Sequence, residues 1–249
     1  MRKILSARYT PMLRQFVSGD VLLAFDFDGT LSPIVSRPGG ARIDRSTRAL
    51  LKRLARLYPC VVISGRGRAD VACRVRGIGF REVIGNHGIE PWDSTRAIER
   101  RVQGWVPKLR KELRRFPGAL LENKGFSLSV HYRNAPRKRE LIAAVKRVAA
   151  KTPMARLVDG KKVLNLVPRG PADKGAALRR EMRKRHCDRA VYVGDDHTDE
   201  SIFALPLRKK LLTIRVGATR ASRARYFIRN QREIDRLLRV LIQARRRVA

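Results

Sequence analysis

The sequence predicts an α/β protein with a parallel sheet between helices and a second, smaller α/β unit inserted into it. Three observations support this prediction. Val21–Phe25 is an apolar run typical of a strand buried on both faces, as in a parallel sheet with helices on either side. Two further apolar runs, 61–63 and 190–193, also lead into polar residues. Between these two runs, residues 96–167 repeat the order helix, strand, strand twice.

The first apolar run leads directly into two carboxylates, Asp26 and Asp28. They stand at the carboxyl end of the predicted strand, where open α/β sheets bind ligands. Side chains two residues apart on an extended chain point the same way, so both can face one site. Two such charges repel each other unless a cation lies between them or one is protonated. Mg²⁺ suits oxygen ligands of this kind, because it binds few carboxylates and keeps waters and substrate phosphate as its other ligands.

The residues around this pair resemble a known family. Asp26-Phe27-Asp28-Gly29-Thr30 is similar to the first motif of the haloacid dehalogenase (HAD) superfamily, which consists mostly of Mg²⁺-dependent phosphatases with a nucleophilic aspartate. The three other motifs of the superfamily follow in order at residues 61–66, 173–175 and 194–200. Each motif stands at a predicted strand end or helix start, so the four together are far more specific than one Asp-x-Asp pair.

The extension Leu31-Ser32-Pro33-Ile34 narrows the resemblance to the trehalose-6-phosphate phosphatases. The resemblance covers residues from about 22 to 238 and implies two structural parts. Residues 1–92 and 170–249 form a Rossmann-like HAD core with a parallel sheet. Residues 93–169 form a small α/β cap of type C2 with a four-stranded sheet, a substrate lid that excludes water when it closes.

The cap segment has the pattern that this expectation requires. Apolar residues recur at helical spacing in 96–115 and 137–150. Two short strand-like runs follow each helix, and turn signals at 123–125 and 159–161 close the two hairpins. The four runs cover residues 119–122, 126–132, 156–158 and 162–167.

The resemblance implies a role for each catalytic residue. Asp26 is the nucleophile that forms an aspartyl-phosphate intermediate, and Asp28 is the general acid that protonates the leaving sugar oxygen and then activates water. Ser64 donates a hydrogen bond to a phosphoryl oxygen, and Lys174 places a compact positive charge on the phosphoryl group. A catalytically silent HAD module fits less well, because every catalytic position is filled.

The resemblance also implies a Mg²⁺ site. Its protein ligands are the carboxylates of Asp26 and Asp195 together with the backbone carbonyl of Asp28. Asp196 and Asp199 are expected to orient these ligands instead of binding the ion directly.

Substrate contacts are expected from both parts of the chain. Glu122-x-Lys124 and His131-Tyr132-Arg133 resemble cap segments that contact sugar hydroxyls, and His87 belongs to a Gly-rich element near the hinge. The competing interpretations are a solvated hairpin, a sheet face of alternating polarity, and a structural loop around a satisfied histidine. The expected substrate-binding residues are Gly65, Arg66, His87, Glu122, Lys124, His131, Arg133 and Asn165.

Asn165 departs from the family pattern, which has glutamate at this position in the last cap strand. A carboxylate that accepts two hydroxyl protons is replaced by an amide that donates on one side, and hydrogen bonds of this kind can decide specificity. Trehalose 6-phosphate is therefore the leading substrate. Sucrose 6-phosphate and a glycosyl-phosphoglycerate are the alternatives within the same chemistry.

Composition limits the remaining functions. The chain has 249 residues, 43% of them hydrophobic, enough for one large core and a lid. No apolar run approaches the ~18 residues that a membrane span needs, no signal peptide is recognisable, and residues 1–20 resemble an amphipathic leader. The three cysteines form no metal-ligand pair and are expected to be reduced and buried. We therefore expect a cytoplasmic monomer with a small sugar phosphate as its partner and no membrane contact.

The net charge of +35 raises a second class of function, a nucleic-acid-binding protein on a HAD scaffold. Such a charge attracts phosphate-bearing molecules over long distances. The arginines are spread along the chain, aromatic residues make up only 6% of it, and no nucleic-acid motif is present. We therefore expect weak, salt-sensitive binding to nucleic acids and no specific site. The basic segment 229–248 is predicted to be a C-terminal helix, either a solvated tail or an electrostatic anchor.

Overall fold

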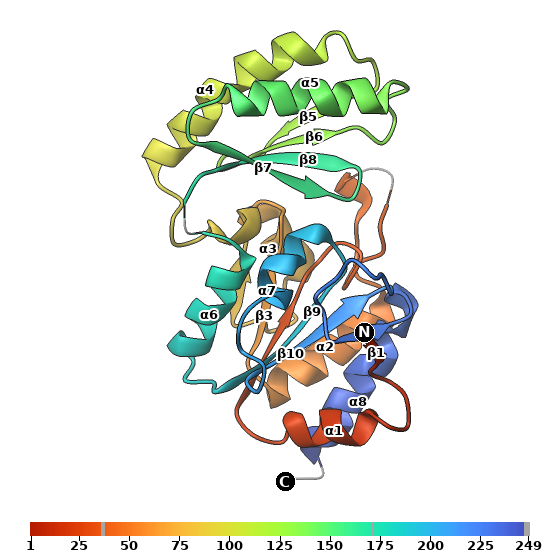
Figure 1. Cartoon of the computed structure of the whole chain (residues 1–249). Helices are drawn as coiled ribbons and strands as arrows, with labels where there is room; N and C mark the ends of the chain where they lie inside the picture. The colour runs from red at the N-terminus through yellow and green to blue at the C-terminus, as the bar shows by residue number, and fades with distance from the viewer. Residues whose placement is uncertain (36–37, 171, 247–249) are drawn as a thin grey trace.

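The computed structural model describes residues 1–35, 38–170 and 172–246, which form two α/β units, one above the other in Figure 1. The larger unit, the core, has a seven-stranded parallel sheet in the order β1-β11-β10-β9-β2-β3-β4. The smaller unit, the cap, has a four-stranded antiparallel sheet in the order β5-β6-β8-β7. The predicted fold class and the four-stranded cap sheet are confirmed.

The elements of the core come from both ends of the chain. Its strands are β1 (Arg2–Lys3), β2 (Val21–Phe25), β3 (Cys60–Ile63), β4 (Glu82–Ile84), β9 (Arg189–Gly194), β10 (Leu211–Val216) and β11 (Tyr226–Ile228). Its helices are α1 (Thr10–Phe16), α2 (Arg45–Leu57), α3 (Arg68–Val75), α6 (Lys174–Lys184), α7 (Glu200–Phe203) and α8 (Ile234–Arg246). Short 3₁₀ turns are η1 (Pro38–Gly40), η2 (Asn86–Gly88), η3 (His197–Asp199) and η4 (Gln231–Glu233).

Strand β2 lies in the middle of the core sheet, between β3 and β9, with the bounds that its apolar run predicts. Successive side chains of a strand point to opposite faces, so both faces of β2 need apolar residues. Leu23 and Phe25 pack in the cluster that includes α1, α2, α3 and α8. Leu22 and Ala24 pack in the cluster that includes α6 and α7. Burial on both faces explains why the sequence of β2 is apolar throughout.

The two ends of the chain pack on the core. Strand β1 extends the sheet beside β11, and Leu13 of α1 is fully buried in the cluster that contains α8. The predicted amphipathic leader is therefore part of the core. Helix α8 begins at Ile234 and not at residue 229, because η4 precedes it. The apolar face of α8, including Leu238, is buried against the core, so α8 is not a solvated tail. Residues 247–249 lie outside the described part of the chain.

One face of the cap sheet is apolar, and the other carries most of its polar side chains together with Leu120 and Val163. The cap elements are α4 (Arg96–Leu113), β5 (Leu120–Asn123), β6 (Leu128–His131), α5 (Lys138–Ala150), β7 (Ala155–Gly160) and β8 (Val163–Pro168). Helices α4 and α5 cover the face that points away from the core (Figure 1), and Val130 and Leu164 pack against them. The alternate residues Ser129 and Asn165 lie directly opposite each other in neighbouring strands of the sheet. Because side chains alternate along a strand, these polar residues share the face toward the core.

Cys60 and Cys187 are buried free thiols, as predicted, but Cys73 is exposed. Cys73 lies on the outer face of α3, whose buried residues are Val71 and Val75, so the expectation of three buried cysteines is wrong. Among the described residues, no helix combines the length and the apolar composition that crossing a membrane requires.

Candidate active site

The predicted catalytic side chains come together at the carboxyl ends of the central core strands. Asp26 and Asp28 follow β2, Ser64 follows β3, and Asp195 follows β9, while Lys174 is the first residue of α6. Neighbouring parallel strands end at the same edge of the sheet, which is where α/β proteins bind ligands. The topology therefore brings together residues that are far apart in the sequence.

Lys174 is the cation at the centre of this edge. Its side chain is 2% exposed, and its Nζ donates to Asp26 Oδ1 at 2.9 Å and to Asp199 Oδ1 at 2.8 Å. Asp199 Oδ1 also accepts a hydrogen bond from the Tyr192 hydroxyl at 2.6 Å. Burial opposes the charged form of Lys174, but the two carboxylates raise its pKa above the usual value. Burial raises the pKa of Asp26 well above its usual range, and Lys174 opposes that rise.

Three buried carboxylates could hold a metal ion. One oxygen from each of Asp26, Asp195 and Asp199 lies within 4.8 Å of the others. Asp195 Oδ1 is buried and has no hydrogen-bond partner among the described residues, as expected of an oxygen suited to a hard cation. Burial, and then the charge of Asp199, raise the pKa of Asp195 to about 7. The sequence places Asp199 outside the set of direct ligands, whereas the structure brings its carboxylate into the cluster.

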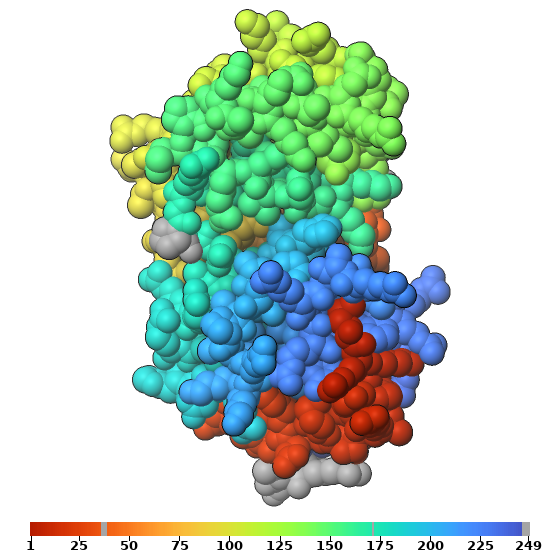
Figure 2. Space-filling model, viewed as in Figure 1, coloured from red at the N-terminus to blue at the C-terminus, as the bar shows by residue number. Residues whose placement is uncertain are grey.

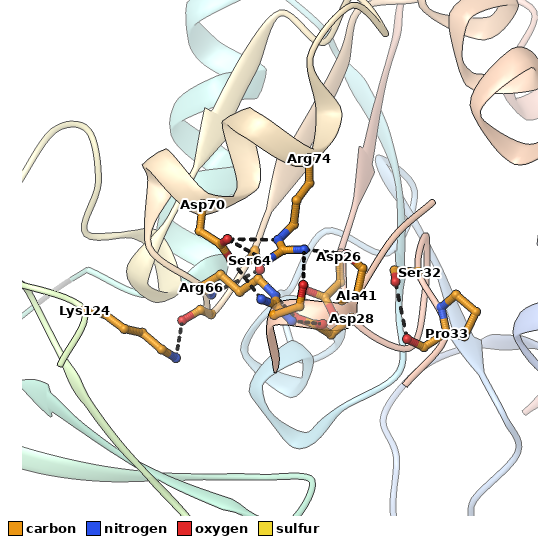
Figure 3. Close-up of polar contacts among 12 residues, drawn as sticks. Asp26, Asp28, Ser32, Pro33, Ala41, Ser64, Arg66, Asp70, Arg74 and Lys124 are labelled. Atoms are coloured by element: carbon orange, nitrogen blue, oxygen red, sulfur yellow. Dashed lines mark hydrogen bonds and ion pairs between the residues drawn. The ribbon is translucent and has the colours of Figure 1, made fainter. Parts of the chain in front are cut away.

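The Asp28 side chain is turned toward Arg66 (Figure 3). Arg66 Nε donates to Asp28 Oδ2 at 2.6 Å and Arg66 Nη2 to Asp28 Oδ1 at 2.7 Å. The backbone N–H of Arg66 donates to Ser64 Oγ at 3.2 Å. Arg66 Nη1 donates to Asp70 Oδ2 at 2.8 Å, and Asp70 also accepts from Arg74. Sequence reasoning missed Asp70 and Arg74; their i, i+4 spacing on α3 is the signal that pairs them.

The cap rests directly on the core (Figure 2), and two sets of polar contacts join them. At the tip of the β7–β8 hairpin, Lys161 Nζ donates to Asp195 Oδ2 at 3.2 Å. The Lys161 backbone N–H donates to Asp196 Oδ2 at 3.3 Å, while the other oxygen of Asp196 caps η3. On the β5–β6 side, Ser127 Oγ donates to Asn86 Oδ1. Lys161 is a functional candidate that the sequence did not suggest beyond its place in a turn.

His87 stands between the core and the cap. Its backbone has φ 59°, a left-handed conformation uncommon for a residue with a side chain. Both ring nitrogens are buried without a hydrogen-bond partner among the described residues. Burial, then the charges of Lys124 and Lys174, lower the pKa of His87 well below its usual value, which favours a neutral ring. A Cβ at Gly65 would lie 2.5 Å from His87 Cε1, so only glycine fits beside the ring.

The predicted cap residues form a polar cluster above this edge. Glu122 Oε2 and His131 Nε2 are 2.7 Å apart, and Lys124 Nζ donates to the Gly65 carbonyl at 3.0 Å. Burial acts to raise the pKa of Glu122, but the hydrogen bond from His131 and the charge of Lys124 lower it overall. Burial lowers the pKa of Lys124. These groups place hydrogen-bond donors and an ionised acceptor side by side over the carboxyl edge of the core sheet.

Asn165 is tied into the cap sheet. Its Oδ1 accepts a hydrogen bond from Ser129 Oγ at 2.6 Å, and its Nδ2 donates to the Val158 carbonyl at 3.3 Å. The side-chain oxygen is therefore already engaged by a neighbouring strand, and the amide nitrogen has one hydrogen left for a ligand.

A cavity of about 260 Å³ lies between cap and core. Ser64 and Asp199 do not line it; each is buried at the edge of the sheet. Lys161, Lys162 and Thr198 line it without having been predicted. The predicted residues that line it are Asp26, Asp28, Gly65, Arg66, His87, Glu122, Lys124, His131, Arg133, Asn165, Lys174, Asp195 and Asp196.

The chain is similar in sequence to trehalose-phosphate phosphatases. The model of the trehalose-phosphatase family matches residues 24–231. The chain is 41% identical over 196 residues to a trehalose-phosphate phosphatase of Mycolicibacterium paratuberculosis, a match that covers 72% of this chain and 49% of that protein. It is 38% identical over 194 residues to the same enzyme of Mycobacterium ulcerans, with 72% and 50% covered. The chain thus spans about half the length of the curated relatives it matches.

A solved structure is similar over nearly the whole chain. The C-terminal domain of the trehalose-6-phosphate phosphatase of C. albicans superposes with a TM-score of 0.79, covering 94% of this chain and 96% of that one. The sequence identity is 21%, so this likeness establishes the fold.

Proposed function

The chain belongs to the trehalose-phosphatase family, and from that premise we propose that it hydrolyses trehalose 6-phosphate to trehalose and phosphate. The observation that supports a phosphatase is the buried cluster of Asp26, Asp195 and Asp199 around Lys174. A cluster of this kind supplies a nucleophile, a cation site and a fixed positive charge at one point, beside the cavity between cap and core.

The proposed reaction has two steps. In the first, an Asp26 oxygen attacks phosphorus, the bond from phosphorus to the sugar oxygen breaks, and Asp28 gives its proton to the departing oxygen. In the second, water attacks the aspartyl phosphate, Asp28 takes a proton from that water, and the Asp26 carboxylate is released. Lys174 and Ser64 hold the phosphoryl oxygens. Unaided phosphate-monoester hydrolysis is so slow that accelerations up to about 10²¹ are needed, so positioning and charge must act together.

We propose Mg²⁺ as the cofactor, bound by the carboxylates of Asp26 and Asp195 and the backbone carbonyl of Asp28. Asp196 and Asp199 are proposed to orient these ligands, and Asp199 is close enough to bind the ion itself. The unpartnered Asp195 oxygen fits a cation that prefers oxygen ligands. When bound, the ion neutralises charge on the phosphoryl group.

The proposed sugar site is the polar face of the cap. Glu122 is an acceptor and Lys124 a donor for sugar hydroxyls, and His131 orients Glu122. Arg133 and Asn165 line the same cavity and are proposed to bind the sugar too. Hydroxyls both donate and accept hydrogen bonds, so adjacent groups of opposite kind suit them.

On the core side, Gly65, Arg66 and His87 are proposed to complete the substrate site. We further propose that the cap unit spans residues 93–169, that the core spans 1–92 and 170–249, and that the protein acts as a cytoplasmic monomer. The cap elements run from Arg96 to Pro168 in support of these bounds.

The test is Mg²⁺-dependent phosphate release from trehalose 6-phosphate, sucrose 6-phosphate, glucose 6-phosphate, a glycosyl-phosphoglycerate and an aryl phosphate. We expect a large preference in kcat/KM for trehalose 6-phosphate. Asp26→Asn should abolish turnover of every substrate with the fold intact, while the control Asp188→Asn, at an exposed position, should not change it. Turnover of the aryl phosphate alone would refute the proposed substrate, and no turnover at all would refute the phosphatase.

A second variant tests the substrate through Asn165. Asn165→Glu should raise kcat/KM for trehalose 6-phosphate relative to the other sugar phosphates, because it adds a charged acceptor at the polar face of the cap. An unchanged or lower relative value would indicate another sugar as the natural substrate.

A further inference from the structure

The Arg66 guanidinium lies between two carboxylates on the core side of the cavity (Figure 3). It donates to both oxygens of Asp28, at 2.6 and 2.7 Å, through Nε and Nη2. A two-point contact of this kind fixes the plane of the carboxyl group as well as its position. The Arg66 side chain is 11% exposed, and its guanidinium carbon lies 5.6 Å from the centre of the Phe27 ring. The guanidinium of Arg66 is therefore held in place by packing beside the Phe27 ring.

A second set of contacts anchors Arg66 from behind. Arg66 Nη1 donates to Asp70 Oδ2 at 2.8 Å, and Asp70 Oδ1 accepts from Arg74 Nε at 2.9 Å. Arg74 in turn donates to the carbonyls of Gly39 and Ala41, in the segment that leads into α2. The chain of contacts runs from Asp28 to a neighbouring part of the core. Neither Asp70 nor Arg74 lines the cavity.

We propose that Arg66 is a positioning residue for Asp28, and that Asp70 and Arg74 hold Arg66 in place. The inference rests on the proposed function, in which Asp28 moves a proton in both steps. Arg66 also lines the cavity of the proposed substrate site, and its contacts with Asp28 and Asp70 add a positioning role there.

Asp28 and Asp70 hold the Arg66 guanidinium independently of each other during the reaction. When Asp28 carries the proton for the leaving oxygen, the protonated oxygen still accepts the hydrogen bond from Arg66, but more weakly. The bond from Nη1 to Asp70 does not depend on that proton and keeps the guanidinium where it is. After the proton leaves, both oxygens of Asp28 again accept from Arg66 as a carboxylate. Asp28 therefore faces the leaving oxygen and later the attacking water from one fixed place.

The test uses two substrates with different leaving groups. The alkoxide of a sugar needs a proton in order to leave, whereas the p-nitrophenolate of p-nitrophenyl phosphate is stable without one. Arg66→Ala should lower kcat for trehalose 6-phosphate about 10²–10⁴-fold, the size of a general acid–base contribution, with a small change in KM. For p-nitrophenyl phosphate, kcat/KM should change less than about threefold. This ratio reports only the steps up to phosphoryl transfer to Asp26, and with this leaving group that transfer needs no proton from Asp28.

The decisive measurement is the time course of p-nitrophenol release by Arg66→Ala. The second step still needs Asp28 as a base, so the aspartyl phosphate should accumulate. We expect a burst close to the enzyme concentration, followed by slow turnover. A residue that only binds sugar would give no burst and an unchanged kcat for p-nitrophenyl phosphate. A residue that only supports the fold would lower the burst phase and the slow phase alike. Either result would overturn the inference.

Three further variants make the test specific. Asp70→Asn should give the same pattern with a smaller effect, and Glu140→Gln, at an exposed carboxylate that also pairs with an arginine, should change nothing. Arg66→Lys should recover only part of the loss, because an ammonium group cannot form the two-point contact. Arg133→Ala should raise KM for the sugar phosphate without producing a burst. If the wild-type protein released no phosphate from either substrate, the proposed function itself would be refuted. If the wild type were active but Arg66→Ala gave no burst, only the positioning role of Arg66 would be refuted.

Discussion

Replacing Lys174 by methionine tests the central claim about the site, that one buried ammonium group offsets a cluster of buried carboxylates. Lys174 is 2% exposed, and the side chains of Asp26 and Asp199 that it contacts are 6% and 0% exposed. Methionine fills a similar volume without charge. The variant therefore leaves two carboxylates in a space that water barely reaches.

The expected loss is large. Removing one partner of a buried ion pair costs about 3–5 kcal/mol, because the remaining charge stays buried without compensation. In a protein of this size each kcal/mol corresponds to roughly 2–4 °C, so the melting temperature should fall by roughly 6–20 °C. Loss of Lys174 also removes the contribution that lowers the pKa of Asp26. A carboxyl group whose pKa is higher in the folded state destabilises the fold as pH rises, so the loss should be greatest at alkaline pH and smaller near pH 5.

The assay is urea unfolding of wild type and Lys174→Met without divalent cations, at pH 5 and pH 8. Lys184→Met is the matched control, since Lys184 also contacts a carboxylate, Glu82, but its side chain is 53% exposed and Glu82 keeps Arg68 as a second partner. We expect the control to lose less than about 1 kcal/mol. The double variant Lys174→Met with Asp199→Asn should regain part of the loss. A loss in Lys174→Met no larger than that of the control would refute the reasoning.

Three further predictions concern other parts of the molecule. Burial raises the pKa of Tyr58 to about 12. The free energy of unfolding of the wild type should therefore fall by roughly 1.4 kcal/mol between pH 8 and pH 11, whereas that of Tyr58→Phe should not. Unfolding curves at both pH values check this. At pH 8 the variant should be about 1 kcal/mol less stable, since the Tyr58 hydroxyl donates to the Leu241 carbonyl at 3.1 Å, and parallel pH profiles would contradict the assignment. Gly65→Ala should lower the stability of the fold by about 1–3 kcal/mol and also lower kcat/KM, because the new methyl group would collide with the His87 ring. A thermal melt and an activity assay check both effects. Mg²⁺ at 100 times its Kd should stabilise the wild type by about 2.7 kcal/mol, and an equal shift in Asp195→Asn would exclude Asp195 as a ligand.

Much of the core could be read from local patterns. The run Val21–Phe25 predicts a buried central strand, and the structure confirms it with the same bounds. Because parallel strands end at one edge, the polar residues after β2, β3 and β9 could be expected to meet. The helical spacing of residues 96–115 likewise predicts α4, although the observed helix ends two residues earlier, at Leu113. These features depend on side-chain periodicity along one segment, which is visible in the sequence.

The pairing of side chains across segments could not be read in this way. Arg66 and Asp28 are 38 residues apart, and nothing in either segment indicates a two-point contact instead of a contact with substrate. Lys161 reaches Asp195 over a separation of 34 residues because the β7–β8 hairpin lies against η3 of the core. Asn165 is engaged by a neighbouring strand of its own sheet. Each partnership depends on how two elements pack, not on the residues within one element.

The sequence by itself determined the fold class, the family and the sheet edge at which the predicted catalytic residues meet, because apolar runs and motif spacing are local properties that many residues specify together. The tertiary structure alone decided which carboxylates share one site, which cation offsets them, and which arginine holds Asp28. These outcomes depend on distances of about 3 Å between atoms from separate elements, and burial then strengthens the contacts of Lys174, because little water is left to compete for them.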